Sequence, residues 1–232
     1  MAEKNAGYAS PPCFMHELEE SGPAGVQHAD PRAWDDVRRW RRSERERLIA
    51  ARLALPQADR EASSAKAAVE LDTAIGDPAG KIISVYWPFR GEHDLRPWLA
   101  RAIERGATGA LPVVVEKSAP LELRAYRPGD PLERGIWNIP VPARGDVVIP
   151  DIVIAPLVGY DAAGFRLGYG GGYYDRTLAA LPRKPLVIGL GYALGRLATI
   201  YPQPHDIAMD LVIVACAVAN TAGRPDVAAA RT

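Results

Sequence analysis

The sequence predicts one α/β domain built on a mostly parallel β-sheet. Its 232 residues exceed one average domain but are too few for two large ones, and 48% hydrophobic with 24% charged residues is typical of a globular chain. In the middle of the chain, short apolar runs alternate with segments of helical periodicity, as in parallel α/β sheets. The predicted strands are residues 82–86, 109–115, 151–155, 186–189 and 211–214.

The charge balance and the cysteine content exclude several classes of protein. The 28 basic side chains are matched by 28 acidic ones, so no large positive field exists to hold nucleic acid, and we expect no nucleic-acid partner. Cys13 and Cys216 are too few for a disulfide framework or a structural zinc site, which fits a reducing cytoplasm. The first fifteen residues lack an apolar leader, and the most apolar run, 211–219, is about half a membrane span. We therefore expect a soluble cytoplasmic protein with no membrane contact.

The ends of the chain are expected to lie outside the domain. Residues 1–33 combine prolines and acidic side chains without periodicity, which predicts an extended and flexible arm. Phe14 and Met15 offer an alternative, in which the arm anchors on the domain or on a second subunit. The domain is expected over residues 34–220, followed by a flexible tail over 221–232.

The first predicted helix, residues 35–55, is amphipathic and strongly basic. Apolar or small residues recur every three or four positions, whereas the other faces carry arginines. These are Arg38, Arg39, Arg41, Arg42, Arg45 and Arg47. They form either a ligand-binding surface or a solvated face interleaved with Glu44 and Glu46.

Two more helices are expected before the middle of the chain. An alanine-rich helix spans residues 58–75 and stops before Gly76 and Pro78, because proline cannot continue a helix. Residues 95–105 have helical spacing and lie between the strands at 82–86 and 109–115. Strand, helix and strand joined by short links indicate a parallel pair.

The most informative segment is the glycine-rich stretch from Asp161 to Arg176. It lies between the strand at 152–157 and a helix predicted over 173–181, at the edge where parallel sheets bind ligands. Free backbone amides beside a helix N-terminus suit phosphate. Arg166 can pair with phosphate oxygens, and Asp175 offers an oxygen ligand for Mg²⁺. A tight loop without a ligand is the alternative.

Other catalytic patterns are missing from the sequence. The glycine-rich stretch has neither the GxxxxGK[ST] nor the GxGxxG spacing, and no serine stands in a GxSxG turn. The glycines at 189–195 are interpreted as a structural turn. His93 and His205 each adjoin an acidic residue whose titration they could tune, whereas His16 and His28 lie in the arm.

Ordered blocks of sequence resemble one known family. The stretch 166–175, Arg-Leu-Gly-Tyr-Gly-Gly-Gly-Tyr-Tyr-Asp, is similar to the signature of the 5-formyltetrahydrofolate cyclo-ligases, also called methenyltetrahydrofolate synthetases. The supporting blocks, in the family's order, are residues 86–97, 137–142, 150–156, 159–161 and 205–206. Together the blocks cover about residues 38–215.

The resemblance implies a fold, a reaction and its cofactors. The fold is a single three-layer α/β/α domain of the NagB/RpiA/CoA-transferase-like class. The reaction converts 5-formyltetrahydrofolate into 5,10-methenyltetrahydrofolate. ATP is consumed, ADP and phosphate are released, and Mg²⁺ is bound as a cofactor. The enzyme would phosphorylate the formyl oxygen, after which N10 attacks the activated carbon. A monomer or a homodimer acting on a small folate, possibly with a glutamate tail, is expected.

The resemblance also implies roles for individual residues. Arg166, Tyr173 and Glu92 are expected to be catalytic. The expected ATP site comprises Arg41, Arg42, Arg45, Arg166, Leu167, Gly168, Tyr169, Gly170, Gly171, Gly172, Tyr173 and Tyr174. The folate is expected on Trp87, Glu92, Trp137 and Tyr173, and Mg²⁺ on Asp175 and Asp206. Alternatively, Trp137 is a core residue and Glu92 a surface carboxylate.

One departure from the family concerns the first helix. The family usually presents a lysine and, four residues later, an arginine to the phosphates, but this helix contains no lysine. Arg45 fits the arginine, which leaves Arg41 or Arg42 in the place of the lysine, and a planar guanidinium is not equivalent to an ammonium. A regulatory folate- or nucleotide-binding protein with little turnover therefore stays open, as does activation of another formyl or amide substrate.

Overall fold

The computed structural model describes residues 31–215, and the expectations for residues 1–30 and 216–232, including Cys13, Cys216, His16 and His28, lie outside the described residues. Helix α1, Pro31–Leu53, starts four residues earlier than predicted and takes the last three residues of the predicted arm. Among the described residues, no helix is long and apolar enough to cross a membrane.

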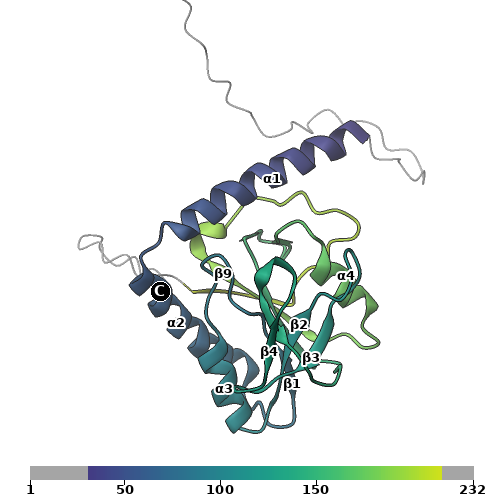
Figure 1. The fold of residues 1–232 in the computed structure, drawn as a ribbon. Helices are drawn as coiled ribbons and strands as arrows, with labels where there is room; N and C mark the ends of the chain where they lie inside the picture. Colours follow the sequence, from purple (N-terminus) through teal and green to yellow (C-terminus); the bar gives the residue numbers. More distant parts are fainter. Residues whose placement is uncertain (1–30, 216–232) are drawn as a thin grey trace, which may run out of the picture.

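A six-stranded sheet forms the centre of the domain (Figure 1). Its order is β10 (Leu211–Ala215), β9 (Leu186–Tyr192), β6 (Ile152–Pro156), β1 (Ile82–Ser84), β2 (Thr108–Val113) and β3 (Glu122–Ala125). All neighbours pair in parallel except β2 and β3. The predicted mostly parallel sheet is therefore confirmed.

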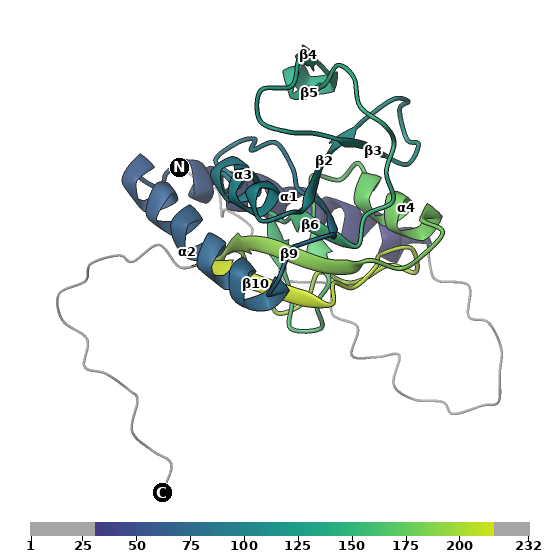
Figure 2. The ribbon, with the colours of Figure 1, turned by 90° about the horizontal axis from the view of Figure 1, so that it is seen from below.

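Helices cover both faces of this sheet. On one face, α2 (Gln57–Ile75) and α3 (Arg96–Glu104) share a buried cluster with the strands that includes Leu71, Leu99 and Ile188. On the other, Leu178 of α4 (Tyr173–Ala180) packs against Leu157, Val187 and Met209. Alternate residues of β9 thus enter different clusters, as the pleat of a strand requires. Figures 1 and 2 show α2 and α4 on opposite sides of the sheet.

The basic helix α1 crosses one end of the sheet (Figure 1). It buries Leu48 in a small cluster with Val158, Leu167 and Ile200. This contact leaves another face of the helix directed toward the loops that follow the strands. The helix therefore serves as one wall of the site described below.

The glycines at 189–195 do not form the predicted turn. Gly189 and Gly191 lie inside β9, which continues to Tyr192, and only Ala193–Gly195 forms a short 3₁₀ turn, η2. A Cβ on Gly191 would lie 2.0 Å from Leu157 Cδ1, and one on Gly189 would lie 1.9 Å from Met209 Sδ. These glycines are needed because neighbouring side chains pack directly against the backbone of the strand.

Several short elements were not predicted. Strand β4 (Leu132–Arg134) pairs with β5 (Pro140–Pro142), and between them lies the 3₁₀ turn η1 (Ile136–Asn138). Figure 2 shows this hairpin standing away from the central sheet, beyond β3. A second two-stranded hairpin joins β7 (Gly159–Tyr160) to β8 (Arg166–Leu167).

Candidate active site

A cavity of about 410 Å³ opens at the carboxyl edge of the parallel strands. Tyr86 and Trp87 follow β1, Val114 follows β2 and Pro156 ends β6, and all four line it. We call this space the inner cavity. It continues past α1 into a groove of about 930 Å³, the outer groove. Arg41, Arg45, Arg90, Tyr169, Gly170 and His205 line both spaces.

The glycine-rich loop forms one wall of the inner cavity. It runs from Gly168 to Gly172, between the short strand β8 and helix α4, so the β7–β8 hairpin separates it from the parallel strand that was expected to precede it directly. Gly170 has a φ of +93° and Gly172, the N-cap of α4, a φ of +62°. Both values lie in the left-handed region that favours glycine. The loop thus brings bare backbone to the N-terminus of a helix.

Arg166 and Asp175 form a buried ion pair beside this loop. Arg166 Nη2 lies 2.8 Å from Asp175 Oδ1, and Arg166 Nη1 donates to the backbone oxygen of Ile207. Ile207 N donates to the same Oδ1 at 3.0 Å. The arginine side chain is 4% exposed, and its guanidinium lies over the ring of Tyr174. The loop, α4 and the segment before β10 are thereby held together.

Two arginines of α1 face the cavity, four residues apart. Arg41 is buried, donates to the backbone oxygens of Ile200 and Tyr201 at 2.9 and 2.8 Å, and pairs with Asp206. Arg45 Nε donates to Gly168 O at 2.7 Å, and burial together with the charge of Arg41 lowers the pKa of Arg45. Burial alone would raise the pKa of Asp206, but hydrogen bonds from Arg41 and Gln203 N hold it below its usual value.

The sequence leaves open whether Arg41 or Arg42 faces the site, and Arg42 is the one that does not face the inner cavity. Its side chain is 82% exposed, it pairs with Glu46, and it lines the outer groove but not the inner cavity. Arg41 therefore occupies the position four residues before Arg45 on the cavity face. The helix therefore has two basic faces: Arg41 and Arg45 line the inner cavity, whereas Arg39 and Arg47 pair with acids on the exposed surface.

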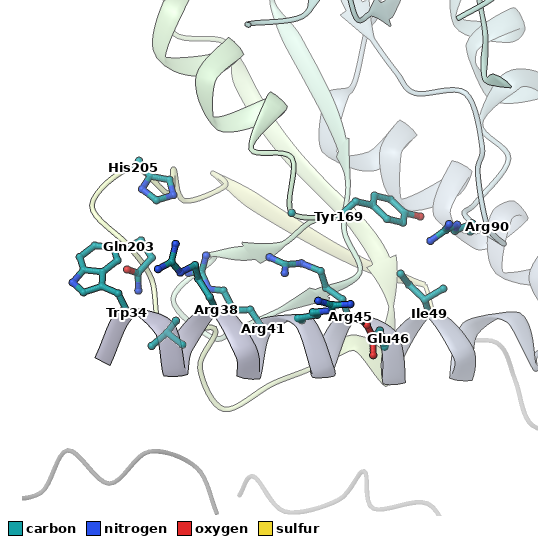
Figure 3. A pocket seen from close by; sticks show the side chains of 13 residues that line it. Trp34, Arg38, Arg41, Arg45, Glu46, Ile49, Arg90, Tyr169, Gln203 and His205 are labelled. Atoms are coloured by element: carbon teal, nitrogen blue, oxygen red, sulfur yellow. Dashed lines mark hydrogen bonds and ion pairs between the residues drawn. The ribbon is translucent and has the colours of Figure 1, made fainter. Parts of the chain in front are cut away.

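The outer groove is lined mainly by positive charge. Figure 3 shows Arg38, Arg41 and Arg45 rising from α1, with His205 and Tyr169 across the groove. Arg90 closes the end near Tyr169, and Trp34 lies at the other end. Glu46 is the acidic residue on this lining. Such a groove suits an anionic ligand that also carries a flat apolar group.

Glu92 is buried at the inner end of the site, so the alternative of a surface carboxylate is wrong. Its Oε2 accepts a hydrogen bond from Phe89 N, and its Oε1 accepts one from the Tyr169 hydroxyl, both at 2.9 Å. Burial raises the pKa of Glu92 to about 7, against the opposing effect of the nearby charge of Arg52. This carboxyl group can therefore exchange a proton near neutral pH.

The aromatic side chains predicted for the folate line the same inner cavity. Trp137, at a φ of +58° in η1, is 58% exposed and meets the ring of Tyr173 edge-on at 5.7 Å. The alternative of a core tryptophan is therefore wrong. Trp87 is half-buried beneath the guanidinium of Arg96, with 4.8 Å between guanidinium carbon and ring centroid.

The two histidines next to acidic residues behave differently. The positive charge of His205 contributes to the lowered pKa of Asp206. His93 instead turns into the core, where its Nε2 lies 2.9 Å from Ser63 Oγ and its ring stacks on Tyr192 at 4.0 Å. The expectation that His93 tunes Glu92 is thus not supported, since the charge that opposes the raised pKa of Glu92 comes from Arg52.

Most of the predicted site residues lie together, and a few residues were missed. All the predicted site residues line the inner cavity except two, Arg42 and Leu167. The side chain of Leu167 is buried in the cluster with Leu48. Tyr86 and Arg90 were not assigned, although both stand in the block 86–97 that also supplies Trp87 and Glu92. Arg52 was missed as well; its Nη2 donates to the Tyr169 hydroxyl at 2.5 Å and its Nε to Arg90 O at 2.9 Å. A buried arginine at the end of an exposed basic helix has no distinguishing signal in the sequence.

Comparison with known proteins supports one family. Residues 37–215 match the model of the 5-formyltetrahydrofolate cyclo-ligase family. The chain is 31% identical over 183 residues to the 5-formyltetrahydrofolate cyclo-ligase of Haemophilus influenzae, covering 75% of this chain and 95% of that protein. With the enzyme of the same name from Mycolicibacterium smegmatis it shares 33% identity over 143 residues, which cover 58% of this chain and 74% of the relative.

Solved structures agree. The NMR structure of Aquifex aeolicus 5,10-methenyltetrahydrofolate synthetase superimposes with a TM-score of 0.65 at 26% identity, over 75% of this chain and 89% of that one. A 5,10-methenyltetrahydrofolate synthetase from Mycoplasma pneumoniae has the same fold, with a TM-score of 0.61 at 22% identity over 75% and 97% of the two chains.

Proposed function

The chain belongs to the 5-formyltetrahydrofolate cyclo-ligase family, and on that premise we propose that it uses ATP to close 5-formyltetrahydrofolate into 5,10-methenyltetrahydrofolate. The observation that carries the proposal is the continuity of the two spaces. A basic groove meets an aromatic cavity at Arg41, Arg45 and Gly170, which line both. A triphosphate and a flat heterocycle can therefore meet end to end.

The outer groove and the glycine-rich loop form the proposed ATP site. Arg41 and Arg45 offer guanidinium groups on one side, and Gly168–Gly172 offers backbone amides at the N-terminus of α4 on the other. Arg38 and Arg90 extend the positive charge along the groove. Phosphoryl transfer depends mainly on such positioning and charge neutralisation.

The inner cavity forms the proposed folate site. Trp87, Trp137 and Tyr173 present aromatic surface to the pterin and aminobenzoyl rings, and Glu92 lies at the inner end. The γ-phosphoryl group of ATP passes to the formyl oxygen. The bond to the bridging oxygen breaks, and that oxygen leaves with ADP. N10 then attacks the formyl carbon and loses its proton, and the carbon–oxygen bond breaks to release phosphate. Glu92, with a pKa of about 7, is suited to accept that proton, while Arg166 and Tyr173 position the phosphate end.

The predicted Mg²⁺ ligands fit the metal unequally. Both contacts of Asp175 are made to Oδ1, so its Oδ2 has no partner among the described residues. Asp206 fits only if it releases Arg41, which engages both of its oxygens. Mg²⁺ is typically held by one or two carboxylates plus phosphates, and Asp175 alone satisfies the protein's share. When bound, the ion neutralises charge on the β- and γ-phosphates.

Further properties of the proposed enzyme follow from the same features. Arg38 and Arg90 can also pair with the carboxylates of a folate glutamate tail. The cytoplasm is the proposed compartment, because one-carbon chemistry on reduced folates and the scarcity of cysteines both fit reducing conditions. One chain supplies every residue of the proposed site, so the site can work in a monomer or in each subunit of a homodimer.

The test is direct. Incubation with 5-formyltetrahydrofolate and MgATP should produce the methenyl chromophore together with ADP and phosphate, and product no higher than in a control without enzyme would overturn the proposal. Arg45→Gln should raise KM for ATP roughly tenfold or more by removing a charge-assisted contact. Arg39→Gln, on the exposed face of the same helix, is the matched control. Tight folate binding without turnover would identify the regulatory alternative.

A further inference from the structure

Arg52, in the last turn of α1, is a buried charge to which the proposed reaction gives no role. It is 3% exposed, and within residues 31–215 its guanidinium bonds to uncharged oxygens and forms no direct ion pair. These oxygens are Arg90 O at 2.9 Å, the Tyr169 hydroxyl at 2.5 Å and Leu157 O at 3.4 Å. Burying a charge is unfavourable unless an opposite charge compensates it. The compensating group for Arg52 therefore lies beyond its direct contacts.

The Tyr169 hydroxyl connects Arg52 to Glu92. An arginine side chain can only donate, so the hydroxyl oxygen accepts from Arg52 Nη2 and gives its own proton to Glu92 Oε1 at 2.9 Å. A cationic donor on the hydroxyl oxygen polarises the O–H bond and strengthens the second hydrogen bond. The carboxylate of Glu92 is thus the negative partner of Arg52, reached through one hydroxyl group.

Arg52 also holds the turn that carries Glu92. Glu92 N donates to Phe89 O at 3.1 Å, which closes a turn over residues 89–92, and Arg90 in this turn has a φ of +47°. Such a left-handed value is unfavourable for a residue other than glycine and persists where surrounding contacts enforce it. The bond from Arg52 Nε to Arg90 O is one such contact. One guanidinium therefore braces both the backbone beside Glu92 and the tyrosine that orients its carboxylate.

We propose that Arg52 is a positioning residue for the proposed reaction: through the Tyr169 hydroxyl and the turn at residues 89–92, it holds the carboxylate of Glu92 in place and in its ionised form. Arg52 lines neither the inner cavity nor the outer groove, so it acts through these neighbours and not on a ligand. The inference rests on the proposed function, because it takes Glu92 as the group that accepts a proton from the substrate.

The other titratable groups around Glu92 are uncharged in the range where it titrates. Four tyrosines couple to Glu92, and all stay protonated because burial raises the pKa of each hydroxyl. They are Tyr86, Tyr169, Tyr174 and Tyr192. His93, the next residue in the chain, has a pKa that burial lowers to about 4. The charge that acts on Glu92 within the described chain is therefore that of Arg52, and it favours the ionised form.

The test follows the titration of Glu92 in the free protein by NMR of its side-chain carboxyl carbon, with the signal assigned from Glu92→Gln. In Arg52→Gln the pKa of Glu92 should rise by about 0.5 unit or more, because a positive charge that favours the carboxylate is lost. Tyr169→Phe removes only the connecting hydroxyl and should shift the pKa in the same direction. Arg60→Gln is the matched control: Arg60 on α2 donates to Leu55 O, and its charge does not act on Glu92, so the pKa should stay that of the wild type.

Turnover of 5-formyltetrahydrofolate with MgATP provides the second readout. Arg52→Gln and Tyr169→Phe should each lower kcat roughly tenfold, because the carboxylate is less well placed and less often ionised. A base acts in its ionised form, so the acidic limb of kcat/KM for the folate should move to higher pH with the pKa of Glu92. The double variant should lose no more activity than Arg52→Gln alone, since both changes act on one carboxylate.

An unshifted pKa of Glu92 in Arg52→Gln would overturn the inference, and so would a wild-type pH profile in a variant whose Tm has fallen, because Arg52 would then be a purely structural contact. If Arg52→Gln does not fold, Tyr169→Phe decides, and an unshifted pKa in that variant would refute the connection. The NMR titration needs neither folate nor ATP. Wild-type protein that does not cyclise the folate would therefore refute the proposed function, while the titration would still show whether Arg52 holds Glu92.

Discussion

Glu92 carries the most perturbed carboxyl group of the cavity, and its titration should be visible in the stability of the protein. Burial raises its pKa in the folded state to about 7, against about 4.5 in the unfolded chain. Between these values the folded state binds more protons than the unfolded state, so the free energy of unfolding falls as pH rises. The shift corresponds to roughly 3 kcal/mol, fully lost above pH 7.

Glu92→Gln should therefore change the pH profile of stability. We expect the variant to lack the contribution of Glu92 to this profile, so that its free energy of unfolding relative to that of the wild type improves by roughly 3 kcal/mol between about pH 4.5 and 7. Urea unfolding at pH 4.5, 6.5 and 8 measures the profile. Parallel profiles for the two proteins would show that Glu92 is not titrating with a raised pKa.

His93 should oppose Glu92 in the same pH range. Burial lowers the pKa of His93 to about 4, so the unfolded state binds more protons between about pH 4 and 6.5 and stability rises with pH there. In the wild type the two effects offset each other below about pH 6.5. Once Glu92 is replaced, the rise caused by His93 should remain by itself, which makes its slope an internal control for the measurement.

Arg41 makes contacts that a positive charge alone does not explain. Its guanidinium donates to Ile200 O and Tyr201 O and pairs with Asp206, and one ammonium group cannot reach all three. Arg41→Lys, which introduces the residue type that the family resemblance leads us to expect here, should destabilise the protein by about 1–3 kcal/mol by leaving buried acceptors unpaired.

Arg42→Lys is the matched control for this change. Arg42 is exposed and pairs with Glu46, so its replacement should alter the free energy of unfolding by less than about 0.5 kcal/mol. Thermal or urea unfolding of both variants measures the difference. Equal stability of the two would mean that a lysine fits the Arg41 position, and that the planar group is not required there.

At the level of elements, strand β9 needs glycines where neighbouring side chains pack directly against its backbone. A Cβ at Gly191 would overlap Leu157 Cδ1 and Cγ, at 2.0 and 2.8 Å. Gly191→Ala should therefore destabilise the protein by about 1–3 kcal/mol through overpacking. At Gly168 a Cβ meets nothing within 4 Å and φ is not positive, so Gly168→Ala should retain its Tm. If both alanine variants melted together, packing against Leu157 would not be what demands glycine in β9.

The elements that could be predicted from the sequence are those whose burial leaves a local pattern. The parallel strands β1, β2, β6, β9 and β10 are apolar on both faces because helices cover both, so they read as continuous apolar runs. Strand β3 has the sequence Glu-Leu-Arg-Ala, and β4 is exposed throughout. Pairing partners distant in the chain, rather than local pattern, define these two short strands.

The residues of the candidate site also fall into two groups, those that local sequence blocks predict and those that only the tertiary fold places. Contiguous blocks identify the glycine-rich loop, Glu92 and Trp137 in advance. The choice between Arg41 and Arg42 depends on how α1 rests on the segment around Ile200, some 160 residues later in the chain. Likewise the role of Arg52 follows from its contact with Tyr169, 117 residues away. Contacts of this range are set by the tertiary fold and leave no local signal in the sequence.

A net charge of zero conceals an uneven distribution over the molecule. Arg38, Arg41, Arg42, Arg45, Arg90 and His205 line one groove, with Glu46 as the acidic residue among them. A positive groove concentrates anions near its mouth, and salt screens this effect, with a Debye length of about 10 Å at 0.1 M. The proposed ATP site should therefore depend on ionic strength even though the protein as a whole is neutral.

We expect KM for ATP to rise several-fold between about 50 and 300 mM salt, with little change in kcat, because screening weakens encounter and binding rather than chemistry. Arg38→Gln, which removes one exposed charge from the groove, should raise KM at low salt and flatten this dependence. Arg101→Gln, on α3 at the other face of the sheet, removes the same charge far from the groove and should retain the wild-type slope. Equal slopes for all three proteins would show that the charges of the groove act on ATP no differently from the rest of a neutral surface, and would place the triphosphate elsewhere.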